Sequence, residues 1–131
     1  MDRERKRAIL KDSAFIPLQI QGLKDRYDEL LTTATHITAG YEGSGSSTHN
    51  NDSKIEKNVV KLTEISLKIA KLEAKYERIN KSINELKPYH RFLIIQVDVK
   101  GKGIRRVAKE THRDPSSLTK TYNKALDSLK L

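Results

Sequence analysis

The feature that most constrains the fold is a regular series of three- and four-residue steps between apolar positions in the middle of the chain. Nine of the ten positions in this series are apolar, and the tenth is Asn58. Such a repeat places one apolar stripe along a helix, as in coiled coils, and predicts a helix of about 33 residues. The ten positions are Ile55, Asn58, Leu62, Ile65, Ile69, Leu72, Tyr76, Ile79, Ile83 and Leu86.

Local signals predict where this helix begins and ends. Ser53 is a suitable N-cap, and Glu56 three residues later completes a capping box. Pro88 disfavours the α conformation at Lys87, so we expect the helix to end there. The stretch 40–53, GYEGSGSSTHNNDS, is rich in Gly, Ser and Asn and predicts a flexible loop before the helix.

A shorter series with the same spacing precedes this loop, and Pro17 suits the first turn of its helix. Two such helices joined by a loop predict a long antiparallel hairpin of coiled-coil type. Because the first helix covers only part of the second, pairing with another copy of the chain is an open alternative, with Asn58 fixing the register. The positions of the shorter series are Ile16, Ile20, Leu23, Tyr27, Leu30, Ala34 and Ile37.

After Pro88 the pattern changes to shorter helices. The run 89–97, YHRFLIIQV, is expected to be a helix, although its β-branched and aromatic residues leave a short strand as an alternative. Gly101 and Gly103 allow positive φ in a basic turn, and 104–111 predicts two further helical turns. The residues expected to face inward from the first helix are Phe92, Leu93, Ile95 and Val99.

The spacing that follows is typical of a helix-turn-helix. Ala108 allows two helices to cross closely, His112 suits a left-handed turn, and Leu118 supplies an apolar contact ten residues after Ala108. Asp114 is a good N-cap and Pro115 a good first residue for a last helix that extends to about residue 130. The inner face of that helix is expected to consist of Leu118, Tyr122, Ala125, Leu126 and Leu129.

The fold class that we expect is therefore all-α. Residues 1–87 form the helical hairpin with its flexible loop at 40–53, and residues 88–131 form a three-helix helix-turn-helix module. The basic N-terminal segment MDRERKRAILKDSAF is expected to be a frayed, solvated helix start. A small arm that contacts DNA or a membrane surface is the alternative for this segment.

The positive charge is concentrated in the C-terminal module. The formal net charge is +9, and residues 88–131 carry 10 basic against 4 acidic side chains. A local basic excess attracts polyanions, so we expect this module to bind double-stranded DNA with its last helix in the major groove. Candidates for reading base edges are Ser116, Thr119, Lys120 and Asn123. Candidates for phosphate contacts are Lys100, Lys102, Arg105, Arg106, Arg113, Ser117 and Lys124.

The stretch 99–129, VKGKGIRRVAKETHRDPSSLTKTYNKALDSL, resembles region 4 of the sigma-70 class of RNA polymerase sigma factors. With the break at 30–45, the layout is similar to that of the RinA/ArpU-like late transcription regulators of phages and their uncharacterised relatives. Lys124-Ala125-Leu126 and Leu129 match the frequent ending of that family. The resemblance implies a transcription regulator that contacts RNA polymerase, with recognition positions at Pro115, Ser116, Thr119 and Lys120.

Two other functions stay open. A phage DNA-packaging protein of the small-terminase kind also combines a helix-turn-helix with coiled-coil parts, and a coiled-coil adaptor would bind protein through its C-terminal bundle. No pattern indicates an enzyme, a cofactor or a metal site, since cysteine is absent and the four histidines are scattered. No signal peptide or membrane span is expected, and we place the protein in the cytoplasm of a bacterial host.

Overall fold

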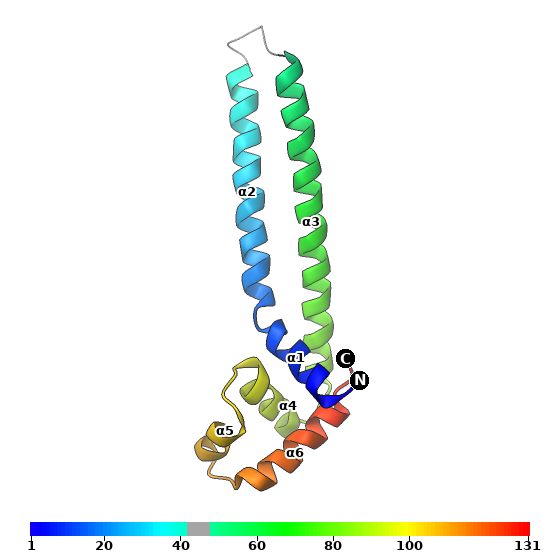
Figure 1. Cartoon of the computed structure of the whole chain (residues 1–131), viewed down its shortest axis with the longest axis vertical. Helices are drawn as coiled ribbons and strands as arrows, with labels where there is room; N and C mark the ends of the chain where they lie inside the picture. Colours follow the sequence, from blue (N-terminus) through cyan, green and yellow to red (C-terminus); the bar gives the residue numbers. More distant parts are fainter. Residues whose placement is uncertain (42–47) are drawn as a thin grey trace. The chain divides into compact units, whose positions relative to one another are not determined.

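The computed structural model describes the backbone of residues 1–41 and 48–131 and the side chains of residues 1–33 and 55–131. In these ranges the chain is helical with no strand, so the expected all-α class is confirmed. Figure 1 labels the α-helices. In chain order the helical elements are α1 (Arg3–Ser13), α2 (Ile16–Tyr41), α3 (Thr48–Asn84), α4 (Pro88–Ile94), the π-helical η1 (Ile95–Val99), α5 (Ile104–Glu110) and α6 (Pro115–Ser128).

The chain divides into two compact units that differ from the division expected at residue 87. Unit 1 consists of Met1–Ile16 together with Ala74–Leu131, and unit 2 consists of Pro17–Glu73. The difference arises because α1 packs on η1 and α6, and because the last turns of α3 also belong to unit 1. The segment 88–131 is therefore only part of a larger unit.

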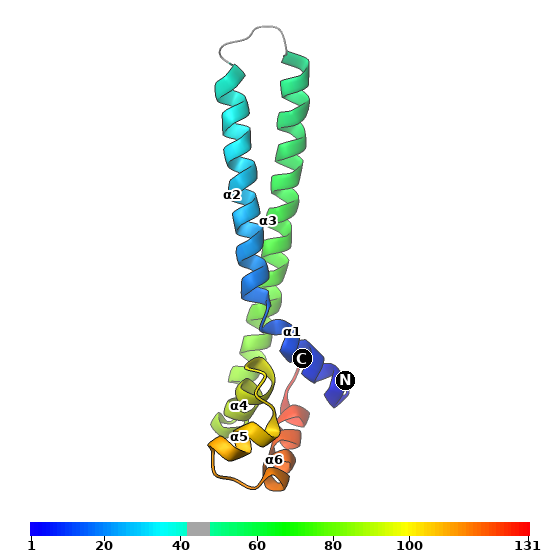
Figure 2. The same ribbon diagram turned by 60° about the vertical axis from the view of Figure 1, so that its left-hand side comes forward.

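Unit 2 contains two long helical segments, from α2 and α3, that run in opposite directions side by side (Figures 1 and 2). An ion pair joins the segments, with Lys24 Nζ 3.8 Å from Glu73 Oε1. Heptad positions such as Leu23, Leu62 and Ile69 are half-buried, while Ile65 is buried. The apolar stripes are thus partly covered within the unit.

Two of the expected helix limits are wrong. Helix α2 extends to Tyr41 and α3 begins at Thr48, so Ser53 lies inside a helix and does not cap it. Between Gly45 and Pro88 the chain has no Gly or Pro. The polar residues that follow Gly45 lower the stability of a helix by only about 0.7 kcal/mol each or less. Of the residues expected in the loop, 40–41 belong to α2 and 48–53 belong to α3. The other residues of the expected loop, 42–47, lie outside the described residues.

Helix α1 is a packed part of unit 1, so the expectation of a frayed, solvated helix start is wrong. The side chain of Asp2 caps the helix by accepting a hydrogen bond of 2.8 Å from the backbone N–H of Arg5. Leu10 is fully buried, and Ser13 is buried as well. Burial of Leu10 therefore helps to hold this charged segment against the rest of the unit.

The first helix of the C-terminal segment departs from regular α geometry. A π-helical turn covers 95–99, where the N–H of Lys100 donates to the carbonyl of Ile95 over 2.8 Å. The extra residue in this turn changes which side chains face inward. Phe92 is 39% exposed, and Ile95 and Val99 are only half-buried, so the expected inward face is wrong except at Leu93. The buried side chains are those of Leu93, Ile94, Val97 and Asp98.

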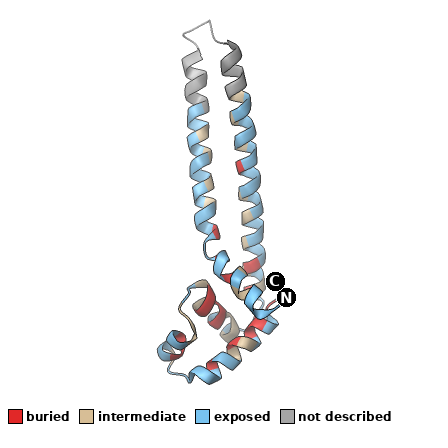
Figure 3. Ribbon diagram, in the orientation of Figure 1, coloured by how far each residue is buried: buried red, intermediate tan, exposed pale blue. Residues whose placement is uncertain are grey.

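The turn and the last helix follow the sequence-based predictions closely. Gly101 and Gly103 have φ of 67° and 81°, and His112 has φ of 53°. Ala108 and Leu118 are buried where α5 meets α6. All the residues predicted for the inner face of α6 are buried, and Figure 3 shows buried residues on α4, α5 and α6. The core of unit 1 therefore lies under one face of α6.

Candidate nucleic-acid interface

The first turns of α6 present polar side chains away from the core of unit 1. Asp114 caps the helix through a hydrogen bond of 3.2 Å from the N–H of Ser117, and Pro115 occupies the first turn. Leu118 faces the core, so the side chains on either side of it point outward. Pro115, Ser116, Ser117, Thr119 and Lys120 are exposed. Asn123 is half-buried.

The hydroxyl groups on this face are partly engaged by their own helix. Thr119 Oγ1 donates to the carbonyl of Pro115 over 2.8 Å, and Thr121 Oγ1 donates to the carbonyl of Ser117 over 3.2 Å. A hydroxyl that donates in this way keeps lone pairs that can accept. Thr119 is therefore set to accept a hydrogen bond from a ligand, and Lys120 supplies a nearby charged donor.

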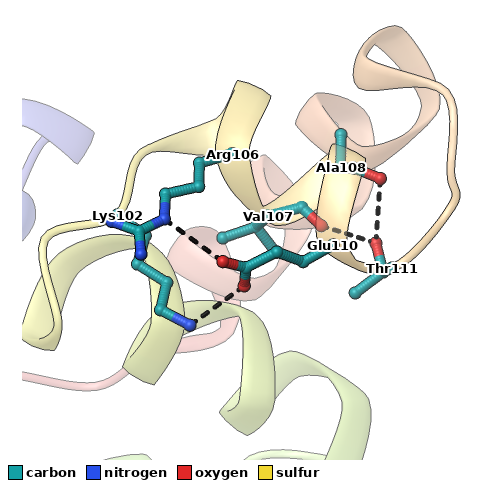
Figure 4. Close-up of polar contacts among 6 residues, drawn as sticks. All are labelled: Lys102, Arg106, Val107, Ala108, Glu110 and Thr111. Atoms are coloured by element: carbon teal, nitrogen blue, oxygen red, sulfur yellow. Dashed lines mark hydrogen bonds and ion pairs between the residues drawn. The ribbon is translucent and has the colours of Figure 1, made fainter.

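Two of the expected phosphate contacts share one carboxylate (Figure 4). Lys102 Nζ lies 2.9 Å from Glu110 Oε2, and Arg106 Nε lies 3.2 Å from Glu110 Oε1. The hydrogen bond from Lys102, and after it that from Arg106, holds the pKa of Glu110 below its ordinary value. The cluster keeps one net positive charge, and Glu110 competes with any phosphate for both cations.

The end of α5 beside this cluster is closed by a side-chain hydrogen bond, also drawn in Figure 4. Thr111 Oγ1 donates to the carbonyl of Val107 over 2.7 Å. The oxygen also lies 3.4 Å from the carbonyl of Ala108. Both carbonyls also accept backbone hydrogen bonds of 2.9 Å, Val107 from the N–H of Thr111 and Ala108 from the N–H of Arg113. The bond fixes the point at which the chain leaves α5 for the turn at His112.

Arg113 is placed by an aromatic ring. Its guanidinium carbon lies 4.8 Å from the centre of the Tyr89 ring, which itself stacks on Phe92 at a centroid distance of 6.5 Å. A guanidinium held over a ring keeps its N–H edge free for other acceptors. The residue is exposed, so that edge faces solvent beside the start of α6.

The remaining cationic candidates have no such constraint. Lys100, Arg105 and Lys124 are exposed, and none of them forms an ion pair with a side chain in the described part of the chain. Lys109, which the sequence analysis left out, is exposed in the last turn of α5. The surface formed by α5, α6 and their flanking turns thus combines polar side chains with two kinds of cation. Some are paired with Glu110 or stacked on Tyr89, and others form no ion pair with a described side chain.

A buried polar cluster that the sequence analysis missed supports α6 from its inner side. The carboxylate of Asp98, which is 1% exposed, accepts hydrogen bonds from the hydroxyl of Tyr122 and, over 3.3 Å, from Arg7 Nε. The guanidinium carbon of Arg7 also lies 5.7 Å from the centre of the Tyr122 ring. Burial, and then the bond to Asp98, raises the pKa of the Tyr122 hydroxyl well above its ordinary value.

Two contacts at the other end of α6 add to this support. Arg3 binds both carboxylate oxygens of Asp127, over 2.9 and 2.8 Å, and Lys6 Nζ donates to the carbonyl of Leu126 over 2.7 Å. The bond to Arg3 holds the pKa of Asp127 below its ordinary value. Among the contacts of α1, only that between Arg7 and Asp98 has a signal in the sequence, which is Asp98 within an apolar run, since a buried carboxylate needs a partner. Nothing local identifies that partner as Arg7.

Comparisons with protein-family models, with curated proteins and with solved structures gave no match. Within residues 1–33 and 55–131, whose side chains the structure describes, no three acidic or histidine side chains are grouped in a way that would hold a metal ion. None of the helices in these ranges combines the length and the apolar character of a membrane span.

Proposed function

We propose that unit 1 binds double-stranded DNA, with the first turns of α6 in the major groove. The observation that carries the proposal is the division of α6 into two faces. The buried face is fixed by the core and by Asp98, while Ser116, Thr119 and Lys120 are exposed beside the cations of two turns. A recognition helix needs such a rigid support and a free polar face.

The function that we propose is regulation of transcription without catalysis. The chain places itself upstream of a promoter and contacts RNA polymerase, as the resemblance to sigma region 4 and to phage late regulators implies. It works in the cytoplasm of the bacterial host. Copies of the chain associate through the heptad helices α2 and α3, whose apolar stripes are only partly covered and which carry further exposed apolar side chains such as Leu67.

The proposal is tested by the binding of duplex fragments selected from the encoding genome, measured by fluorescence anisotropy over a range of salt concentrations. About six cations near α6 are available to neutralise phosphates, so affinity should fall roughly a thousandfold between about 50 and 200 mM salt. Retention of no duplex at low salt would rule out the proposed function.

Two substitutions separate base contacts from phosphate contacts. Lys120→Ala should weaken binding to the selected fragment by about 1–3 kcal/mol and reduce discrimination against altered fragments. Arg105→Ala should weaken binding to all fragments alike. Lys68→Ala removes an exposed lysine from unit 2 and serves as the control with no expected effect. Equal effects of Lys120→Ala on every fragment would remove its role in reading bases.

A further inference from the structure

Unit 1 contains a cavity that the proposed DNA contacts do not use. Its volume is about 520 Å³, and it is lined by the last turns of α3, by Ile9 of α1 and by residues 130–131. Sites that enclose a ligand or several side chains typically measure about 300–1,000 Å³. The cavity lies past the C-terminal end of α6, whereas the proposed recognition residues lie in its first turns. From Lys120 to the end of α6 at Ser128 the helix continues for eight residues, or about 12 Å.

The lining of this cavity combines an apolar floor with a positive rim. Ile79 is buried, Ile9 is half-buried, and Leu131 is 36% exposed. The rim has a single acidic side chain, that of Glu85, against four exposed cationic ones. The cations are Lys75, Arg78, Lys81 and Lys130, and none of them forms an ion pair with a side chain that the structure describes.

We infer that this cavity docks an acidic, apolar peptide segment of a partner protein. Carboxylates on the segment would meet the four cations, and one or two of its apolar side chains would cover Ile9 and Ile79. A peptide fits better than nucleic acid, because phosphates gain nothing from an apolar floor. An amphipathic helix presents both kinds of side chain at once. The inference does not rest on DNA binding.

The probe for this inference is a fluorescent peptide of about three helical turns, with Leu on one face and Glu on the other. Fluorescence anisotropy measures its affinity for the full chain. Two further peptides, one with Gln for Glu and one with Ala for Leu, should each bind about tenfold more weakly, since the site requires both features. Methyl NMR should show shifts of Ile9 and Ile79 but not of Ile65, which lies in unit 2.

Charge reversal in the rim provides the decisive comparison. Arg78→Glu with Lys81→Glu should weaken the peptide about tenfold, because each reversal turns an attraction into a repulsion. Lys68→Glu with Lys71→Glu makes the same change in charge, with the same spacing, on the part of α3 that lies in unit 2. This matched variant should stay within about twofold of the unaltered chain.

Three results would overturn the inference. The first is no binding of the Leu–Glu peptide, and the second is equal loss in the two charge-reversal variants. The third is loss of duplex DNA binding in the Arg78/Lys81 variant well beyond that in the Lys68/Lys71 variant, which would identify the rim as a nucleic-acid contact. If the unaltered chain bound the peptide but no DNA, the docking site would stand and the proposed function would fail.

Discussion

The two units of the chain use their apolar residues in different ways. In unit 1, side chains such as Leu93, Leu118 and Leu126 are almost fully buried, and a buried carboxylate is bound by two partners. In unit 2, most heptad positions are half-buried, while Leu18 and Leu67 are 72% and 58% exposed. The difference teaches that a regular apolar repeat predicts helices well but does not by itself provide a closed core.

The largest expected effect compares one leucine from each unit. Leu126→Ala should destabilise unit 1 by about 3 kcal/mol, because it removes a fully buried side chain and leaves a cavity. Leu62→Ala should destabilise unit 2 by about 1 kcal/mol, since the side chain is already half-solvated. Hydrogen exchange measured by mass spectrometry reports each unit separately. Equal losses would contradict the contrast between the units.

The next effect concerns the two carboxylates that α1 binds. Asp98→Ala should destabilise unit 1 by about 2 kcal/mol, because the buried hydroxyl of Tyr122 loses its acceptor. Asp127→Ala removes an exposed ion pair with Arg3 and should change little. Denaturation in urea, followed by the exchange of α6 amides, measures both. If Asp127→Ala destabilised unit 1 more than Asp98→Ala, the exposed ion pair with Arg3 would stabilise α6 more than the buried hydrogen bonds of Asp98 do.

The third expected effect is a loss of stability of unit 1 at alkaline pH. The folded state raises the pKa of Tyr122, so it keeps a proton that the unfolded chain loses above about pH 10. Stability is full below that pH and falls as the pH rises toward the raised pKa, by at most about 1.4 kcal/mol per pH unit. Tyr122→Phe should make this decline less steep. Tyr27→Phe, in unit 2, should leave it unchanged, and identical slopes in all three proteins would refute the effect.

The smallest expected effect tests whether a second copy covers unit 2. Leu67→Lys should weaken self-association about fivefold, because it places a charge on the exposed apolar surface of α3. Ser66→Lys adds the same charge at the neighbouring exposed position and should change association little. Sedimentation equilibrium measures both. A chain that stays monomeric at every concentration would show that the stripes of unit 2 remain partly solvated.

Prediction from sequence succeeded where the signals were local. The cap at Asp114, the turn at His112 and the inner face of α6 depend on residues within one or two helical turns. The beginning of α3 was missed, because polar residues without Gly or Pro can extend a helix beyond a plausible cap. The inward face of 89–99 was missed because a π-helical turn has no clear signature in sequence.

In the candidate site, too, the features that depend on nearby residues were predicted and those that depend on distant residues were not. The exposure of Ser116, Thr119 and Lys120 follows from the position of Leu118 on the same helix. Pairing of Arg106 with Glu110 follows a four-residue spacing, but the approach of Lys102 depends on the shape of the glycine turn. The contact between Arg7 and Asp98 joins residues 91 positions apart, and no local pattern encodes such a distance.

The bond between Arg3 and Asp127 spans 124 positions, so the unit proposed to hold DNA is assembled from two segments that are remote along the chain. During synthesis, α1 leaves the ribosome long before η1 and α6 exist. Its buried face stays without its partners until η1 and α6 have been added, and closing so long a loop slows folding. The proposed competence to bind DNA would then appear only late in translation, and loss of the first helix would impair the proposed recognition surface of α6 at the other end of the sequence.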